Sequence, residues 1–262
     1  MKAELHWGLL GFREFFEMSR LYDVLCQSEK EKVRVLHPAA DPQPGERGRH
    51  RSDLGGSALE ETVKFVQRVF VFPNSHSPRV VVFSGVENNG SSEICYRTGE
   101  VLAAQGSGSV CLVDANLHAP SLYQLLRVGR CPGLAEATVR PGPIKTFAAR
   151  IAGGNLWVVP PGSLAQEAHN LFLSDGLRSR MVDLKEEFDY VLIDASPVSS
   201  NADAVLLGQM ADGIILVVQA DSTRREAGLI AKETIDNAKV RLLGAILTGR
   251  KFPIPEALYR ML

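Results

Sequence analysis

Small and polar residues crowd segment 84–92, which directly follows a short apolar run. A buried strand that runs into a glycine-containing turn and then a helix can wrap phosphates with backbone N–H groups. In such a loop a lysine reaches the terminal phosphates, and a Ser or Thr hydroxyl binds Mg²⁺. Gly85 and Gly90 stand at glycine positions of this pattern, and Ser92 stands at the hydroxyl position. Ser91, however, holds the lysine position, so the segment predicts a phosphate-binding loop without its cation.

Two carboxylates end later apolar runs. Asp114 follows Val110–Val113, and Asp194 follows Tyr190–Ile193. A carboxylate at the end of a buried strand is costly unless it meets a cation or a donor. Taken singly, either aspartate could cap the following helix or turn. Taken with the glycine loop, in this order and spacing, the two aspartates predict the Mg²⁺ part of a nucleotide site.

Apolar runs alternate with segments of helical periodicity through the chain. Several runs are continuously apolar, which is typical of parallel strands with helices on both faces. The expected strands are Val80–Ser84, Val110–Asp114, Asn155–Val159, Tyr190–Asp194, Gly213–Gln219 and Leu243–Leu247, and the expected helices lie near 58–72, 92–105, 164–187, 200–210 and 223–238. Such alternation forms βαβ units, whose ligands gather at the carboxyl ends of the strands. The predicted fold class is α/β, a three-layer P-loop NTPase-like fold with a mostly parallel sheet.

Composition narrows the class of protein. A net charge of −1 over 262 residues argues against a general electrostatic role on nucleic acid, so no nucleic-acid partner is expected. No apolar run reaches the roughly 18–20 residues that span a bilayer, and no signal peptide is visible. The four cysteines lack metal-ligand spacing and are expected to be reduced thiols. These features predict a cytoplasmic location.

Changes in composition predict three regions. Residues 1–35 contain apolar residues at helical spacing and are expected to form an N-terminal helical arm. Residues 36–57 are rich in Pro, Gly and charge and are expected to form a flexible linker. Residues 58–262 are expected to form the P-loop domain.

From about Glu61 to the C-terminus, the chain resembles the bacterial tyrosine kinases of capsule and exopolysaccharide synthesis, a family of P-loop ATPases. Besides the glycine loop, the matching segments are 114–120, 132–136, 158–162, 188–194, 202–204 and 211–218. Residues 18–25 also look like the start of a stand-alone family member. Residues 1–17 are therefore expected to be an extension or to precede the true start.

This resemblance implies a site for ATP or ADP with Mg²⁺. The family's nucleotide-binding positions are occupied here by Gly85, Gly90, Ser91, Ser92 and Thr248. Ser92, Asp114 and Asp194 are the implied Mg²⁺ ligands, and the two aspartates are the catalytic candidates if the site is active. The implied partner is a membrane polysaccharide chain-length or export protein, or a kinase paralogue. Recruitment to the inner face of the membrane would follow, and a homo-oligomer is left open.

The chain departs from the family pattern where the chemistry would occur. Besides Ser91 for the lysine, Asn116 replaces the second aspartate of the family's Asp-x-Asp-x-Arg strand, and His118 replaces its arginine. Thr248 replaces the adenine-reading asparagine, and Glu87-Asn88-Asn89 replaces Pro-Gly-Glu. On the helix used for oligomerisation, the family's Glu-x-x-Arg-x-x-Arg is matched by Glu61, Lys64 and Gln67, so both arginines are replaced. The tail carries one tyrosine, Tyr259, in place of a tyrosine-rich segment.

These departures leave two main hypotheses. In the first, the chain is a catalytically degenerate relative that regulates or scaffolds polysaccharide synthesis and export through binding. In the second, it is a divergent but active ATP-dependent protein tyrosine kinase or ATPase. The second hypothesis needs another cation near the phosphates, either Arg97 or a residue supplied in trans, although Arg97 is expected on the solvent face of its helix. A cargo-positioning switch of the partitioning type is a third hypothesis, which the residues at 120 and 160–162 disfavour.

Overall fold

The computed structural model describes residues 35–36, 56–71, 77–87, 90–106, 108–130, 132–152, 154–163 and 171–249. Apart from Val35, the predicted N-terminal arm lies outside these residues, as do most of the predicted linker and the tail from residue 250. Val35–Leu36 form strand β1, and helix α2 begins at Gly56, so both borders of the predicted linker carry regular structure. The division into three regions stays a prediction.

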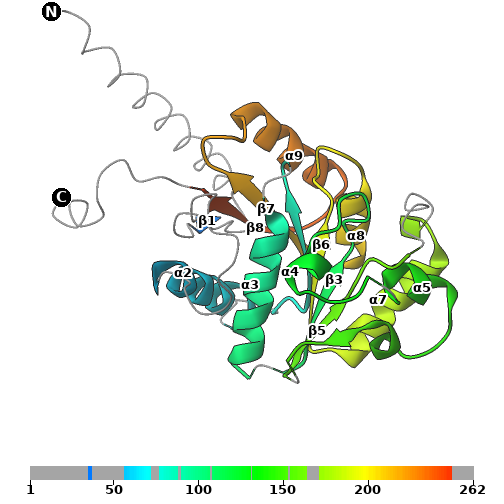
Figure 1. The fold of residues 1–262 in the computed structure, drawn as a ribbon. Helices are drawn as coiled ribbons and strands as arrows, with labels where there is room; N and C mark the ends of the chain where they lie inside the picture. Colours follow the sequence, from blue (N-terminus) through cyan, green and yellow to red (C-terminus); the bar gives the residue numbers. More distant parts are fainter. Residues whose placement is uncertain are drawn as a thin grey trace, which may run out of the picture.

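An eight-stranded sheet forms the centre of the molecule (Figure 1). Its order is β1-β8-β7-β2-β6-β3-β5-β4, and every neighbouring pair is parallel except β4 with β5. The remaining strands are β2 (Val80–Gly85), β3 (Val110–Asp114), β4 (Ala149–Arg150), β5 (Leu156–Val159), β6 (Tyr190–Ala195), β7 (Gly213–Gln219) and β8 (Leu242–Thr248). The predicted α/β class with a mostly parallel sheet is confirmed.

Helices cover both faces of this sheet, as Figure 1 shows. The helical elements are α2 (Gly56–Val66), the π-helical turn η1 (Gln67–Val71), α3 (Ser91–Ala104), α4 (Leu122–Leu125), α5 (Leu134–Val139), the 3-10 turn η2 (Ile144–Phe147), α7 (Asp175–Glu187), α8 (Asp203–Met210) and α9 (Arg225–Asn237). One core cluster joins α2, α3 and α4 to the sheet, and the other joins α5, α7, α8 and α9. Successive strand residues point to opposite faces, so Val81 and Phe83 enter the first cluster while Val80 and Val82 enter the second. The two clusters make the three layers.

Arg79 and Asp212 tie the amino ends of three neighbouring strands together. The Asp212 carboxylate accepts hydrogen bonds from the backbone N–H groups of Arg79 and Val80, at 2.7 and 2.8 Å. The Arg79 guanidinium donates to the carbonyl oxygens of Phe188 and Asp189, at 2.9 and 3.0 Å. These bonds link β2 to the starts of β6 and β7. They fix the positions of these three strands relative to one another.

Strand order brings β2, β6 and β3 side by side although they are far apart in sequence. Helix α3 leads from β2 over β6 to β3 on one face of the sheet, and α8 leads from β6 across β2 to β7 on the other. The carboxyl ends of the three strands therefore meet at one edge. In open α/β sheets ligands bind at such an edge, where successive crossovers diverge.

None of the helices in the described part of the chain is both long and apolar enough to cross a bilayer.

Candidate functional site

The glycine loop joins β2 to α3 at this edge. Gly90 precedes the helix with φ of 78°, a left-handed conformation that favours glycine because it lacks a Cβ atom. Ser91 and Ser92 are the first two residues of α3, and each is only 9% exposed. The first N–H groups of a helix have no intrahelical partner and carry a partial positive charge. This helix start is therefore suited to an anion, as the sequence predicts. Glu87 is exposed, and residues 88–89 are not described.

Asp114 and Asp194 lie directly beside each other, as register partners at the ends of β3 and β6. Both are fully buried, on the sheet face that α3 covers. The Ser91 hydroxyl donates to Asp194 Oδ1 at 3.2 Å. The backbone N–H of Tyr123 donates to Asp114 Oδ2 at 3.1 Å. Asp114 thus accepts a hydrogen bond from the first turn of α4. It caps this helix, which was one of the two roles that the sequence suggested, and it also lies in the candidate site.

Burial raises the pKa of each aspartate to about 7. For Asp114, backbone hydrogen bonds from Tyr123, Leu122 and Asn116 lower the pKa against the effect of burial. For Asp194, the Ser92 and Ser91 hydroxyls lower the pKa, and the neighbouring Asp114 charge raises it. Two adjacent buried carboxylates favour a proton or a cation between them, because their charges repel.

The two aspartates fit a divalent cation. Asp114 Oδ1 and Asp194 Oδ2 are buried and have no hydrogen-bond partner in the described part of the chain. Buried carboxylate oxygens are normally paired, and Mg²⁺ takes oxygen ligands of this type. The Ser92 hydroxyl interacts with Asp194 and adds an oxygen to the same place. Ser92, Asp114 and Asp194 are thus brought together as predicted, although their role as metal ligands stays a prediction.

Ser121 is a member of the site that sequence analysis missed. Its hydroxyl donates to Ser92 Oγ at 2.7 Å, from the residue immediately before α4. This bond orients the Ser92 hydroxyl, which in turn faces Asp194. The available signal was the position of Ser121 directly after segment 114–120, which matches the family pattern.

The residues that replace the family's second aspartate and arginine are held by neighbours. Asn116 Oδ1 accepts hydrogen bonds from the Ser196 hydroxyl, at 3.1 Å, and from the Ala119 N–H, at 3.2 Å. His118 is 53% exposed, and its Nε2 lies 3.3 Å from a carboxylate oxygen of the buried Asp203. Asn116 is therefore fixed in a neutral network, whereas His118 stands at the surface.

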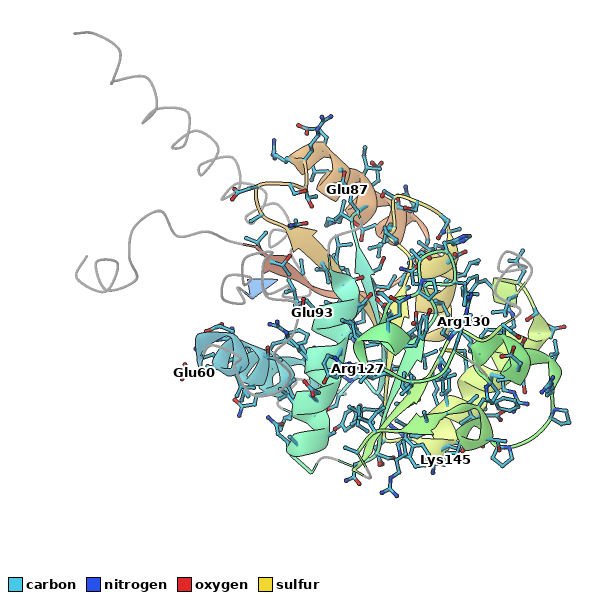
Figure 2. The ribbon with its side chains drawn as sticks, viewed as in Figure 1. Glu60, Glu87, Glu93, Arg127, Arg130 and Lys145 are labelled. Carbon is cyan, nitrogen blue, oxygen red and sulfur yellow. The ribbon has the colours of Figure 1, made fainter. Side chains whose placement is uncertain are left out.

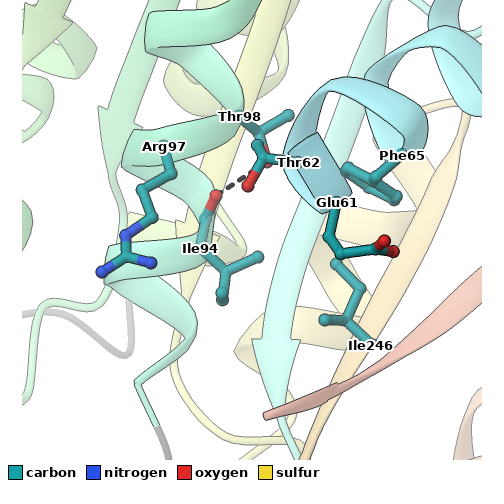
Figure 3. A pocket seen from close by; sticks show the side chains of 7 residues that line it. All are labelled: Glu61, Thr62, Phe65, Ile94, Arg97, Thr98 and Ile246. Atoms are coloured by element: carbon teal, nitrogen blue, oxygen red, sulfur yellow. Dashed lines mark hydrogen bonds between the residues drawn. The ribbon is translucent and has the colours of Figure 1, made fainter. Parts of the chain in front are cut away.

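Arg97 is engaged by a neighbouring carboxylate. It pairs with Glu93 one turn earlier in α3, and its side chain is 17% exposed. Together with Glu61, Thr62, Phe65, Ile94, Thr98 and Ile246, it lines a pocket between α2, α3 and β8. Figure 3 shows its guanidinium directed away from α2 at the edge of this pocket. Arg97 is thus more covered than the solvent-face position we expected, and in the described residues its charge is paired with Glu93.

Thr248 ends β8, two strands away from β2 in the sheet. Its hydroxyl lies 3.4 Å from the carbonyl oxygen of Val218 on β7. Thr248 therefore lies at the carboxyl ends of the strands, but on the β8 side of β2 and away from the serines and aspartates. Its role in adenine recognition stays a prediction.

Comparison with known proteins finds similar sequences among bacterial tyrosine kinases and polysaccharide transport proteins. A scan with models of protein families finds no match. The chain is 28% identical to the tyrosine-protein kinase YwqD of Bacillus subtilis over 172 residues, which cover 66% of this chain and 72% of YwqD. It is 29% identical over 182 residues to the succinoglycan biosynthesis transport protein ExoP of Rhizobium meliloti, covering 66% of this chain but only 22% of ExoP.

Solved structures show the same fold. The kinase domain of the Escherichia coli tyrosine kinase ETK matches with a TM-score of 0.71, covering 85% of this chain and 93% of that domain. The sequence identity is 19%, so this likeness concerns the fold alone.

Proposed function

Because the chain belongs to the family of bacterial tyrosine kinases with a P-loop fold, we propose that it is a catalytically degenerate member. In this proposal it regulates or scaffolds exopolysaccharide or capsule biosynthesis and export. It acts by binding a partner, and it transfers no phosphate to tyrosine.

One observation carries this proposal. Ser91 stands at the lysine position and places a neutral hydroxyl against Asp194. In the described residues, no lysine or arginine lies within ion-pair distance of Asp114 or Asp194. Phosphoryl transfer depends on positioning and on cations that neutralise charge in the transition state. Asn116 also removes the carboxylate that could accept a proton from an attacking hydroxyl, so two parts of the catalytic apparatus are missing.

Weak nucleotide binding is compatible with the same residues. One charge-assisted hydrogen bond to phosphate contributes about 1.5–3 kcal/mol, or roughly ten- to a hundredfold in affinity. The helix start at Ser91 and the Mg²⁺-suited aspartates remain. Transfer therefore suffers more than binding, and ATP or ADP with Mg²⁺ would act as a ligand instead of a substrate.

The proposed partner is a membrane chain-length or export protein, or an active kinase paralogue. The match with ExoP supports this choice, because that relative is named as a transport protein and contains the matched region within a much longer chain. The protein would then be cytoplasmic and recruited to the inner face of the membrane. Genes for glycosyltransferases and an export channel beside its own gene would support the pathway, and a cargo-adaptor gene would count against it.

The test combines calorimetry with a phosphotransfer assay. The purified protein is titrated with ATP and ADP, with and without Mg²⁺, and is then incubated with Mg²⁺-ATP and probed for phosphotyrosine. We expect weak or no binding and no phosphotyrosine. Phosphotyrosine that forms with the wild type and disappears with Asp194→Asn would overturn the proposal.

The alternative function is a divergent active tyrosine kinase or ATPase. It is favoured by the unpaired oxygens of Asp114 and Asp194, which suit Mg²⁺. The same assay decides between the two, because only this alternative predicts turnover that depends on Asp194.

A further inference from the structure

Arg130 is anchored beside the site by a reciprocal pair of bonds. Its Nε donates to the carbonyl oxygen of Gly162 at 3.0 Å, and the Gly162 N–H donates back to the Arg130 carbonyl oxygen at 3.1 Å. Gly162 lies just beyond the end of β5, which is the neighbour of β3. The anchor therefore holds Arg130 at the carboxyl edge of the sheet, on the Asp114 side of the aspartate pair. Figure 2 labels Arg130, and also Arg127 from the same loop between α4 and α5.

The charge of Arg130 acts on the site. Burial raises the pKa of Asp114, whereas backbone hydrogen bonds and the charge of Arg130 lower it. No carboxylate in the described part of the chain lies within ion-pair distance of Arg130. Among the described residues, the Arg130 side chain uses only Nε in a hydrogen bond, so its two terminal nitrogens are available there to another acceptor.

The order of strands indicates which phosphate Arg130 would meet. From the glycine loop on β2, the edge runs to Asp194 on β6, then to Asp114 on β3, and then to β5, where Arg130 is anchored. A nucleotide whose inner phosphates lie against the start of α3 would extend its last phosphate toward the aspartates and beyond them. In that orientation, the terminal phosphate would be the part of the nucleotide nearest to Arg130.

We propose that Arg130 binds the terminal phosphate of Mg²⁺-ATP in this site. A guanidinium suits this task, because its planar donors match phosphate oxygens in pairs. The inference rests on the proposed function, since it requires a site that takes a nucleotide as a ligand. It makes Arg130 a residue that distinguishes a triphosphate from a diphosphate.

The experiment is calorimetric titration of the full chain with Mg²⁺-ATP and Mg²⁺-ADP. We compare the wild type with Arg130→Gln, and with Arg127→Gln as the matched control from the same loop. Arg130→Gln should weaken ATP binding at least tenfold and change ADP binding less than twofold, while Arg127→Gln leaves both unchanged. Arg130→Lys, which keeps the charge but not the planar donors, should fall between the wild type and Arg130→Gln. Thermal unfolding of each variant checks that the fold is kept.

Three results would overturn the inference. They are unchanged ATP affinity in Arg130→Gln, an equal loss of ATP and ADP affinity, and a wild type that binds no ATP at millimolar concentration. None of them depends on phosphotyrosine formation. A wrong role for Arg130 can therefore be told apart from a wrong proposed function, which only phosphotyrosine formation would overturn.

Discussion

Ser91 places a neutral hydroxyl where a lysine would place a charge, and this single exchange changes the balance of the site. The hydroxyl satisfies one oxygen of Asp194 but neutralises neither buried aspartate. Both carboxyls therefore keep a pKa raised to about 7 by burial. At the residue scale, the site is short of one positive charge.

Restoring that charge should strengthen nucleotide binding. We expect Ser91→Lys to raise the affinity for Mg²⁺-ATP by roughly ten- to a hundredfold, the contribution of one charged hydrogen bond to phosphate. Ser91→Gln is the control, because it adds length without charge and should give no such gain. Calorimetry measures both. Equal gains in the two variants would mean that length, not charge, limits binding.

Stability without metal should fall as pH rises toward neutrality. Folding raises the pKa of Asp114 and Asp194 from about 3.9 in the unfolded chain to about 7, so the folded state binds their protons more tightly. Their contribution is complete below the unfolded pKa and is lost as pH rises through the folded pKa. Urea unfolding between about pH 5 and pH 8 should show this decline.

Two variants test the source of this pH dependence. Asp194→Asn should flatten the decline, because it removes one titrating group and its repulsion of Asp114. Asp189→Asn is the control, because hydrogen bonds from Ser109 hold the pKa of Asp189 below its usual value, outside this window. A decline that persists unchanged in Asp194→Asn would contradict the assignment.

At the scale of elements, the junction between α5 and the end of β5 holds one wall of the site. Buried Glu136 accepts bonds from the Gly133 N–H at 2.9 Å, from the Ser163 N–H at 2.8 Å and from the Ser163 hydroxyl. Burial alone would raise the pKa of Glu136, but these bonds bring it below its usual value. Gly162 lies inside this junction and also anchors Arg130.

Gly162→Ala should disturb this junction. Gly162 has φ of 91°, and a Cβ atom there would lie 2.2 Å from Glu136 Oε2. We expect a loss of about 1–3 kcal/mol in the free energy of unfolding, measured by urea titration. Gly154→Ala is the control, because its Cβ would meet nothing nearer than 3.6 Å and its φ lies outside the left-handed region. Similar losses in the two variants would refute a specific role for Gly162.

At the scale of the whole molecule, the two faces of the sheet share one set of strands. Cys95 on α3 belongs to one core cluster and Cys111 on β3 to the other, and both thiols are fully buried. Burial raises the pKa of each thiol, so each is unreactive until the structure around it opens. The accessibility of these two thiols therefore reports on the packing of both layers of helices.

Thiol labelling followed by peptide mass spectrometry should show whether the layers open together. If the domain unfolds as one unit, Cys95 and Cys111 become labelled at the same slow rate, and denaturant accelerates both equally. The fully denatured protein is the control for intrinsic reactivity. Much faster labelling of Cys95 than of Cys111 would mean that α3, and with it the phosphate loop, opens locally.

Sequence alone determined the class of fold and identified the glycine loop and the two aspartates of the candidate site, but it did not identify Ser121. Continuous apolar runs such as those of β2, β6 and β7 predicted buried parallel strands, because a strand covered on both faces needs apolar side chains at every position. The short elements β4, α4, α5 and η2 were not predicted, since two to six residues are too few to show a period. The glycine loop and the two aspartates were recognised through residue type and order. Their roles as ligands stay predictions.

Tertiary structure decided how these residues meet. The placement of β6 between β2 and β3 sets Asp194 opposite Asp114, and periodicity along the chain carries no information about which strands become neighbours. Packing of the elements also brought Ser121 to Ser92 and fixed Arg130 to Gly162. Two of these contacts, Ser121–Ser92 and Arg130–Gly162, join residues about 30 positions apart. They exist only because packing of the helices on the sheet brings distant segments within hydrogen-bonding distance.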